Sequence, residues 1–130
     1  MPLTLRLHKE ALSLCQLPPG TPAPVDILAQ PMTAFFRTYD ETTLLCPTVL
    51  APKNVKSDAG FIALQLVGPF AFGETGILTQ IVNPLATAKV SIVPFATFDT
   101  DYILIKADQR QTATDALKKA GHTVIEAGAP

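Results

Sequence analysis

Apolar residues occupy every second position in two short stretches near the start of the chain, residues 3–7 and 12–14. A period of two residues is typical of a β-strand with one buried face. The polar pair Lys9 and Glu10 separates the two stretches. The pattern therefore predicts a hairpin or a bent strand.

The next part of the chain predicts a loop, a short helix and two further strands. Residues 17–24 contain four prolines, which have no backbone N–H to donate, and one glycine, which loosens the backbone. This stretch is therefore predicted to be a loop. A short helix is expected at 25–30. Strands are predicted at 33–37 and 42–46, joined by the polar turn 39–41.

A polar stretch at 53–60 divides the chain into two parts of similar size. Such a run, with little apolar content, is typical of a connector. We therefore expect an N-terminal lobe at 1–52, a connector at 53–60 and a C-terminal domain at 61–130.

The C-terminal domain begins with a nearly continuous apolar stretch, 61–67, which is typical of a buried strand. Apolar residues spaced four apart over 77–85 then predict an amphipathic helix, in which Pro84 should cause a kink or remove the backbone hydrogen bond that this position would have donated. The following strand, 90–98, contains Pro94, so we expect it at a sheet edge.

The end of the domain repeats this pattern. A short buried strand is predicted at 102–106, and Asp108 with Gln111 marks the start of a helix that Gly121 ends. A last strand is predicted at 123–125. The order strand, helix, strand, strand, helix, strand predicts an α+β domain with the ferredoxin-like βαββαβ arrangement and an antiparallel sheet.

Composition and charge exclude several classes of partner. The chain has 130 residues, 48% of them hydrophobic, which is enough for a substantial core. Its net charge is −1 and its lysines and arginines are scattered, so no nucleic acid partner is expected. The apolar passage 61–72 is shorter than the roughly 20 residues of a membrane helix, and 1–17 does not resemble a signal peptide. We therefore expect a cytoplasmic protein without a membrane partner.

Candidate catalytic and metal-binding residues are few. Cys15 and Cys46 lack metal-ligand spacing and are expected to be buried, inert thiols, with a reactive thiol as the alternative. His8 and His122 are expected to face solvent. The two aspartates of the turn 99–101 favour turn geometry over acid/base catalysis. No cofactor and no catalytic residue is therefore predicted.

Other ferredoxin-like functions need residues that this sequence lacks. The loop 68–76 contains neither the cysteine pair of a metal carrier nor the arginine of an acyl-phosphate hydrolase. The strand residues Ile62, Leu64 and Leu104 do not form the aromatic platform that RNA-recognition modules use. Because many functions share this fold, the fold does not decide between those that remain.

Three segments resemble the ACT-domain family: Gly-Pro-Phe-x-Phe-x-x-Thr-Gly-Ile at 68–77, Pro-Leu-Ala-x-Ala at 84–88 and Thr-Phe-Asp-Thr-Asp-Tyr-Ile-Leu at 97–104. The chain looks most like the small two-lobed group related to the eukaryotic cytosolic arginine sensor. The resemblance extends over 61–125. In the first half, 40–46 is similar to the group's Glu-x-Ser-x-x-Cys strand, with Thr43 in place of the serine.

The resemblance implies tandem ACT-like lobes and a regulatory domain that binds a free amino acid where lobes or subunits meet. In this family the ligand lies between the first strand–helix loop of one domain and the second strand of another. The matching positions here are Glu74, Thr75, Gly76 and Ile77 in the loop, and Thr97, Phe98 and Asp101 at the strand end. Ala96 departs from the serine that the group usually has, which puts one polar contact in question.

The residues also support such a site on physical grounds. Gly76 at a helix start lets a ligand carboxylate approach backbone N–H groups, where the helix dipole favours an anion. Glu74 or Asp101 would face the ligand's ammonium group or a cationic side chain, which slightly favours a basic amino acid. The alternative is that Gly76 permits close helix packing, Phe70 and Phe72 are core residues, and Asp101 fixes a turn.

We therefore predict a non-enzymatic, amino-acid-binding regulatory protein of the ACT type. It is expected to form a homodimer through an exposed sheet edge and to act on a protein partner. The alternative is a structural or protein-interaction module that binds no ligand. A third hypothesis is an enzyme whose mechanism is not recognised, using Glu74 and Asp101.

Overall fold

The computed structural model describes residues 2–68 and 76–127. The chain divides into two compact units. The larger unit consists of Met1–Lys9 and Ile62–Pro130, and the smaller unit is Glu10–Phe61. The first nine residues, expected in the N-terminal lobe, thus group with the C-terminal part of the chain.

Two long strands contribute to both units. β1 (Thr4–Leu17) runs without interruption through Lys9 and Glu10, where a break was expected. β4 (Lys56–Leu66) begins within the predicted connector, so much of 53–60 is strand. Both strands pass through exposed polar positions because hydrogen bonding to a neighbouring strand, and not burial, maintains the extended backbone there.

The larger unit has the predicted order of elements. After β4 come α2 (Ile77–Thr87), β5 (Ile92–Ala96), β6 (Asp101–Lys106), the short 3₁₀ helix η2 (Ala107–Gln109), α3 (Arg110–Lys119) and β7 (Thr123–Glu126). The strands are ordered β5-β6-β4-β1-β7. β5 lies at the edge, as Pro94 predicted, and it pairs with β6 in antiparallel orientation.

One feature of this sheet was not predicted. The N-terminal part of β1 lies between β4 and β7, and it pairs with β7 in parallel orientation, with Thr4 opposite Thr123. The sheet is therefore a ferredoxin-like sheet with one additional strand, which the chain supplies from its beginning.

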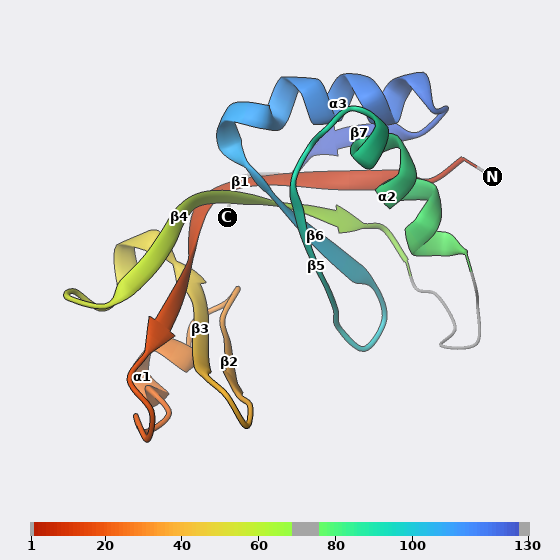
Figure 1. The fold of residues 1–130 in the computed structure, drawn as a ribbon. Coiled ribbons are helices and arrows are strands. Elements are labelled where there is room, and N and C mark those ends of the chain that lie inside the picture. Colours follow the sequence, from red (N-terminus) through yellow and green to blue (C-terminus); the bar gives the residue numbers. More distant parts are fainter. Residues whose placement is uncertain (1, 69–75, 128–130) are drawn as a thin grey trace. The chain divides into compact units, whose positions relative to one another are not determined.

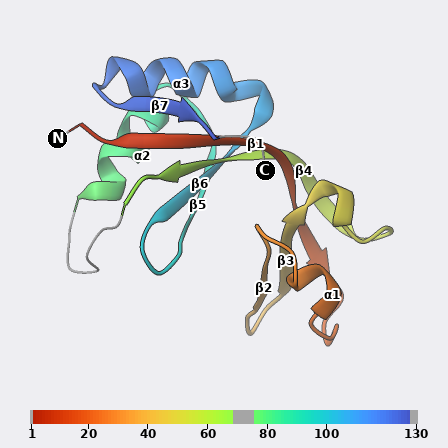
Figure 2. The same cartoon turned by 180° about the vertical axis from the view of Figure 1, so that it is seen from behind.

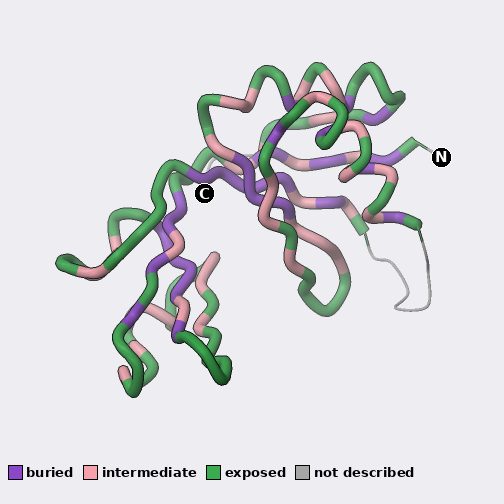
Figure 3. Tube along the Cα trace, viewed as in Figure 1, coloured by how far each residue is buried: buried purple, intermediate pink, exposed green. Residues whose placement is uncertain are grey.

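The core of the larger unit lies between this sheet and the two helices. α2 and α3 lie side by side over one face of the sheet (Figures 1 and 2). Alternate residues of the strands point to the helices, so burial alternates over Thr4–His8, the part of β1 in this unit's core (Figure 3). The buried core residues are Leu3, Leu5, Leu7, Ile62, Leu64, Leu66, Ile77, Ile81, Leu85, Val90, Ile103, Ile105, Ala113 and Leu117.

The smaller unit uses the other parts of the two long strands. It adds α1 (Val25–Leu28), β2 (Ala34–Arg37), β3 (Thr42–Pro47) and the 3₁₀ helix η1 (Thr48–Leu50). Its strands are ordered β2-β3-β1-β4. Its small core contains Cys15, Leu17, Leu44 and Cys46, against which α1 and Phe35 pack.

Candidate functional site

The turn between β5 and β6 is closed by a threonine. The backbone N–H of Thr97 donates to the carbonyl oxygen of Thr100 at 2.8 Å, and the Thr97 hydroxyl donates to the same oxygen at 3.2 Å. Asp101 follows as the first residue of β6, opposite Ala96. Thr97 thus has a structural role in this turn.

A second threonine joins this turn to the end of β4. The hydroxyl of Thr100 donates a hydrogen bond to the carbonyl oxygen of Leu66. Leu66 is the last residue of β4, just before the loop that leads to α2. The strand exit and the beginning of the strand–helix loop are therefore in direct contact.

The entrance of α2 is open at its N-cap residue, on the side that the structure describes. Gly76 has a left-handed backbone with φ of 78° and gives the helix no side-chain cap. A Cβ atom at Gly76 would meet no described atom within 4 Å, so the space beside it is open on the described side. Because the first backbone N–H groups of a helix have no intrahelical acceptor, they are free to bind an anion.

The predicted site residues differ in exposure. Phe98 is 79% exposed, Thr97 is exposed and Asp101 is half-buried. Ile77 is only 8% exposed and its side chain packs in the core, so only its backbone remains for a ligand. Glu74 and Thr75 lie outside the described residues.

A row of side chains that contact one another crosses four strands of the larger unit, and it was not predicted from the sequence. His8 Nε2 lies 2.8 Å from Gln65 Oε1, the His8 and Tyr102 rings are 6.3 Å apart, and Tyr102 stacks on Phe95 at 5.3 Å. His8 is half-buried and does not face solvent freely as expected. The alternation of β1 places His8 on the sheet face opposite Leu5 and Leu7, and this alternation could have predicted that His8 lies among the side chains of that second face.

His122 is also not solvent-facing. It is 8% exposed, and its Nδ1 accepts a hydrogen bond from the backbone N–H of Leu3 at 3.1 Å. Its Nε2 lies 3.0 Å from the carbonyl oxygen of Gln80, to which it donates. Both ring nitrogens thus serve the packing of the larger unit.

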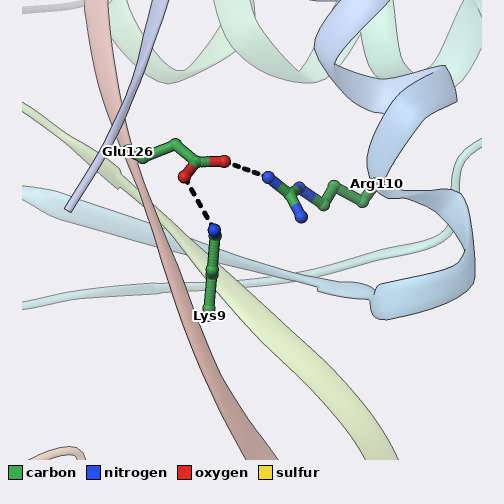
Figure 4. Close-up of polar contacts among 3 residues, drawn as sticks. All are labelled: Lys9, Arg110 and Glu126. Carbon is green, nitrogen blue, oxygen red and sulfur yellow. Dashed lines mark hydrogen bonds and ion pairs between the residues drawn. The ribbon is translucent and has the colours of Figure 1, made fainter. Parts of the chain in front are cut away.

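One ion-pair cluster fixes the last strand of the larger unit (Figure 4). Glu126 accepts hydrogen bonds from Lys9, at 2.8 Å, and from Arg110. The hydrogen bond from Lys9 is the main reason that the pKa of Glu126 lies below its ordinary value. The cluster joins β1, α3 and β7 and is therefore structural.

The two cysteines are buried in the smaller unit and neither forms a disulfide. Burial raises the pKa of Cys15, and burial together with the neighbouring Cys15 raises the pKa of Cys46 to about 11. Both thiols are protonated at neutral pH, and a protonated thiol is a poor nucleophile. The interpretation as inert thiols is supported.

The described residues offer neither a metal-binding cluster nor a helix that could span a membrane. No group of three or more His, Cys, Asp or Glu side chains that could hold a metal ion occurs among residues 2–68 and 76–127. None of the helices in this part of the chain has the length and apolar character needed to cross a membrane.

Part of this chain matches a domain family of known fold. Residues 56–119 match the ACT domain family. This part of the chain therefore belongs to the ACT-domain family and has its ferredoxin-like fold. The predicted family and fold class are confirmed.

A protein called cytosolic arginine sensor for mTORC1 subunit 1, from Rattus norvegicus, is similar to part of this chain. The two are 37% identical over 51 residues, which are 39% of this chain and 15% of that protein. The chain thus matches only a small part of that relative.

Solved structures extend the likeness over the whole chain. The crystal structure of protein Atu0741 from Agobacterium tumefaciens has a TM-score of 0.90 and 27% identity, and the match covers 99% of this chain and 96% of that one. The structure of aspartokinase alpha and beta subunits has a TM-score of 0.65 and 16% identity, covering 93% and 99%. The second likeness concerns the fold alone.

Proposed function

We propose that this protein is a non-enzymatic regulatory module that binds a free amino acid. The ligand lies between the entrance of α2 and the exit of β5. The observation that supports this most directly is the hydrogen bond from Thr100 to Leu66, because it holds the turn after β5 against the end of β4, where the loop to α2 begins.

The two segments offer complementary charges to a zwitterion. The open helix entrance at Gly76 suits the ligand's carboxylate. The carboxylate of Asp101, with Glu74 from the loop, suits the ammonium group and favours a basic amino acid. The relative named as an arginine sensor supports the same chemical class.

The proposal also covers the location of the protein, its assembly and its partner. The chain has tandem ACT-like lobes and acts in the cytoplasm. It forms a homodimer, because β5 leaves a sheet edge with which a strand of a second chain can pair. The signal passes to a protein partner. The competing proposal is a ligand-free interaction module, which the exposed Phe98 at the turn favours, because exposed aromatic side chains anchor protein interfaces.

A thermal-shift screen against the twenty free amino acids tests the proposal. A ligand that binds the folded protein raises its melting temperature, and we expect this for at least one amino acid, with arginine and lysine among the strongest. Asp101→Asn should remove the shift, whereas the control Glu10→Gln, an exposed carboxylate of β1, should retain it. A panel without any shift would favour the interaction module.

A further inference from the structure

The smaller unit repeats the local sequence of the larger unit. β1 and β4 both end in Gln-Leu, at 16–17 and 65–66. The sequence Ile-Leu-Ala-Gln at 27–30 spans the end of the short helix α1, and Ile-Leu-Thr-Gln at 77–80 begins α2. The two units therefore share a strand–loop–helix pattern.

The turns after the next strands are also equivalent. Thr38 donates its backbone N–H to the carbonyl oxygen of Glu41 at 2.9 Å and its hydroxyl to the same oxygen at 3.2 Å. Thr97 makes the same two bonds to Thr100. An exposed aromatic residue, Tyr39 or Phe98, follows each threonine.

The order of strands is equivalent as well. When the strands of the smaller unit are numbered from β1, which ends in Gln-Leu, their order in the sheet is 2-3-1-4. When the strands of the larger unit are numbered from β4, their order is also 2-3-1-4, and the N-terminal part of β1 is inserted between strands 1 and 4. The end of β1 and the turn at 38–41 thus correspond to the end of β4 and the turn at 97–100.

At this corresponding place the smaller unit has a pocket. Its volume is about 390 Å³, which is within the range of small-molecule sites. Its walls come from the end of β1, the turn before β3 and the start of β4. The polar residues that line it are Gln16, Asp40, Glu41, Asn54 and Lys56.

The wall of the pocket is held in place by Arg37. Its guanidinium donates to the carbonyl oxygen of Thr21 at 2.6 Å, which joins the hairpin of β2 and β3 to the proline-rich loop after β1. The same guanidinium lies 5.2 Å from the centre of the Phe35 ring. A proline-rich loop fixed in this way is preorganised, which reduces the entropy lost on binding a ligand.

We propose that this pocket binds a second small zwitterion, a free α-amino acid. Lys56 carries a positive charge on one wall, and Asp40 and Glu41 carry negative charges on another. In the described part of the chain, Lys56 forms no ion pair with either carboxylate. The Lys56 ammonium binds the ligand's carboxylate, and Glu41 with Asp40 binds its ammonium group.

This site goes beyond the proposed function and does not depend on it, because it uses none of the residues of the larger unit. The side-chain amides of Gln16 and Asn54 line the pocket and report directly on its occupancy. A titration followed by ¹H–¹⁵N NMR therefore observes this pocket separately from Gly76 and Thr97.

The experiment titrates the full chain with each of the twenty free amino acids. We expect at least one of them to shift the amide signals of Gln16 and Asn54, and to do so in the Asp101→Asn variant as well. Lys56→Gln and Glu41→Gln should each weaken this binding at least about tenfold, because each removes a charge-assisted bond. The matched controls Lys53→Gln and Glu10→Gln, both exposed, should leave the affinity unchanged.

Two results would overturn this inference. One is an amino acid panel that shifts no signal of the smaller unit. The other is binding there that Lys56→Gln and Glu41→Gln do not weaken. Shifts confined to Gly76 and Thr97 would retain the proposed function and remove the second site, whereas shifts confined to Gln16 and Asn54 would do the reverse.

Discussion

The contact between His122 and Gln80 explains how a proline fits inside α2. Proline has no backbone N–H, so Pro84 does not donate the helical hydrogen bond to the carbonyl oxygen of Gln80, four residues earlier. His122 Nε2 donates to that oxygen instead, at 3.0 Å. The sequence correctly indicated the lost bond, but the helix continues to Thr87 because a distant side chain replaces the donor.

The loss of stability caused by replacing His122 should therefore depend on Pro84. His122→Ala leaves the Gln80 carbonyl and the Leu3 N–H without their partners, and we expect a loss of about 2–3 kcal/mol in the free energy of unfolding. In a Pro84→Ala background the helix supplies its own donor, so the loss should be about 1 kcal/mol smaller. Urea unfolding of the four proteins measures this coupling, and strictly additive effects would contradict it.

The buried thiol of Cys46 makes stability depend on pH. Its pKa is about 11 in the folded chain against an ordinary 9.0. Because the folded pKa is the higher one, the stabilisation is complete below pH 9 and is lost as pH rises towards 11. Between these values the wild-type should lose about 2–3 kcal/mol more than Cys46→Ala, measured by chemical unfolding. Parallel pH profiles of the two proteins would refute this.

The left-handed backbone of Gly76 determines how α2 begins. An alanine there would strain the backbone but meet no described atom, so Gly76→Ala should destabilise the protein by only about 1 kcal/mol. The added methyl group would occupy the space proposed for the ligand carboxylate. We therefore expect calorimetry to show a loss of affinity larger than the loss of stability. Gly76→Asn, which tolerates this backbone better, should recover part of the stability and none of the affinity.

The ion pairs of Glu126 hold β7 against its neighbours. The pKa of this carboxylate is lowered from its ordinary value of 4.5, so its contribution is present above pH 4.5 and is lost as pH falls through the lower, folded value. Glu126→Gln should therefore reduce the acid dependence of unfolding and its sensitivity to salt. Amide exchange of Val124, in the middle of β7, should be faster in this variant. Unchanged exchange would show that strand pairing alone fixes β7.

The elements of the larger unit were largely predictable, and their additional neighbour was not. Alternation, helical spacing and the edge position of Pro94 follow from local patterns. The pairing of β1 with β7 joins residues far apart in sequence, which no local pattern encodes. For the candidate site, the sequence predicted a turn at 99–101 after a strand reaching residue 98, whereas β5 ends at Ala96 and the turn is 97–100. The contact of Thr100 with Leu66 depends on which strands are neighbours, which local patterns do not show.

The two units cannot be separated by cutting the chain once, because the larger unit consists of two segments of the chain. A fragment of residues 61–130 lacks Leu3, Leu5 and Leu7 of its core and the strand with which β7 pairs. We therefore expect this fragment to be largely unfolded by circular dichroism. Adding a peptide of residues 2–17 should restore structure, whereas a peptide with Leu5 and Leu7 replaced by Asp should not. A stably folded fragment would support the division at residue 60.

The parallel pair of β1 and β7 also affects how the protein folds during synthesis. Leu3 and His122 are hydrogen-bonded although they lie 119 positions apart in the sequence. A nascent chain leaving the ribosome therefore presents β1 long before its partner exists, and the sheet of the larger unit closes only when β7 has emerged. Until then the leucines of β1 lack part of the core that covers them, and an incompletely covered apolar strand is prone to aggregate.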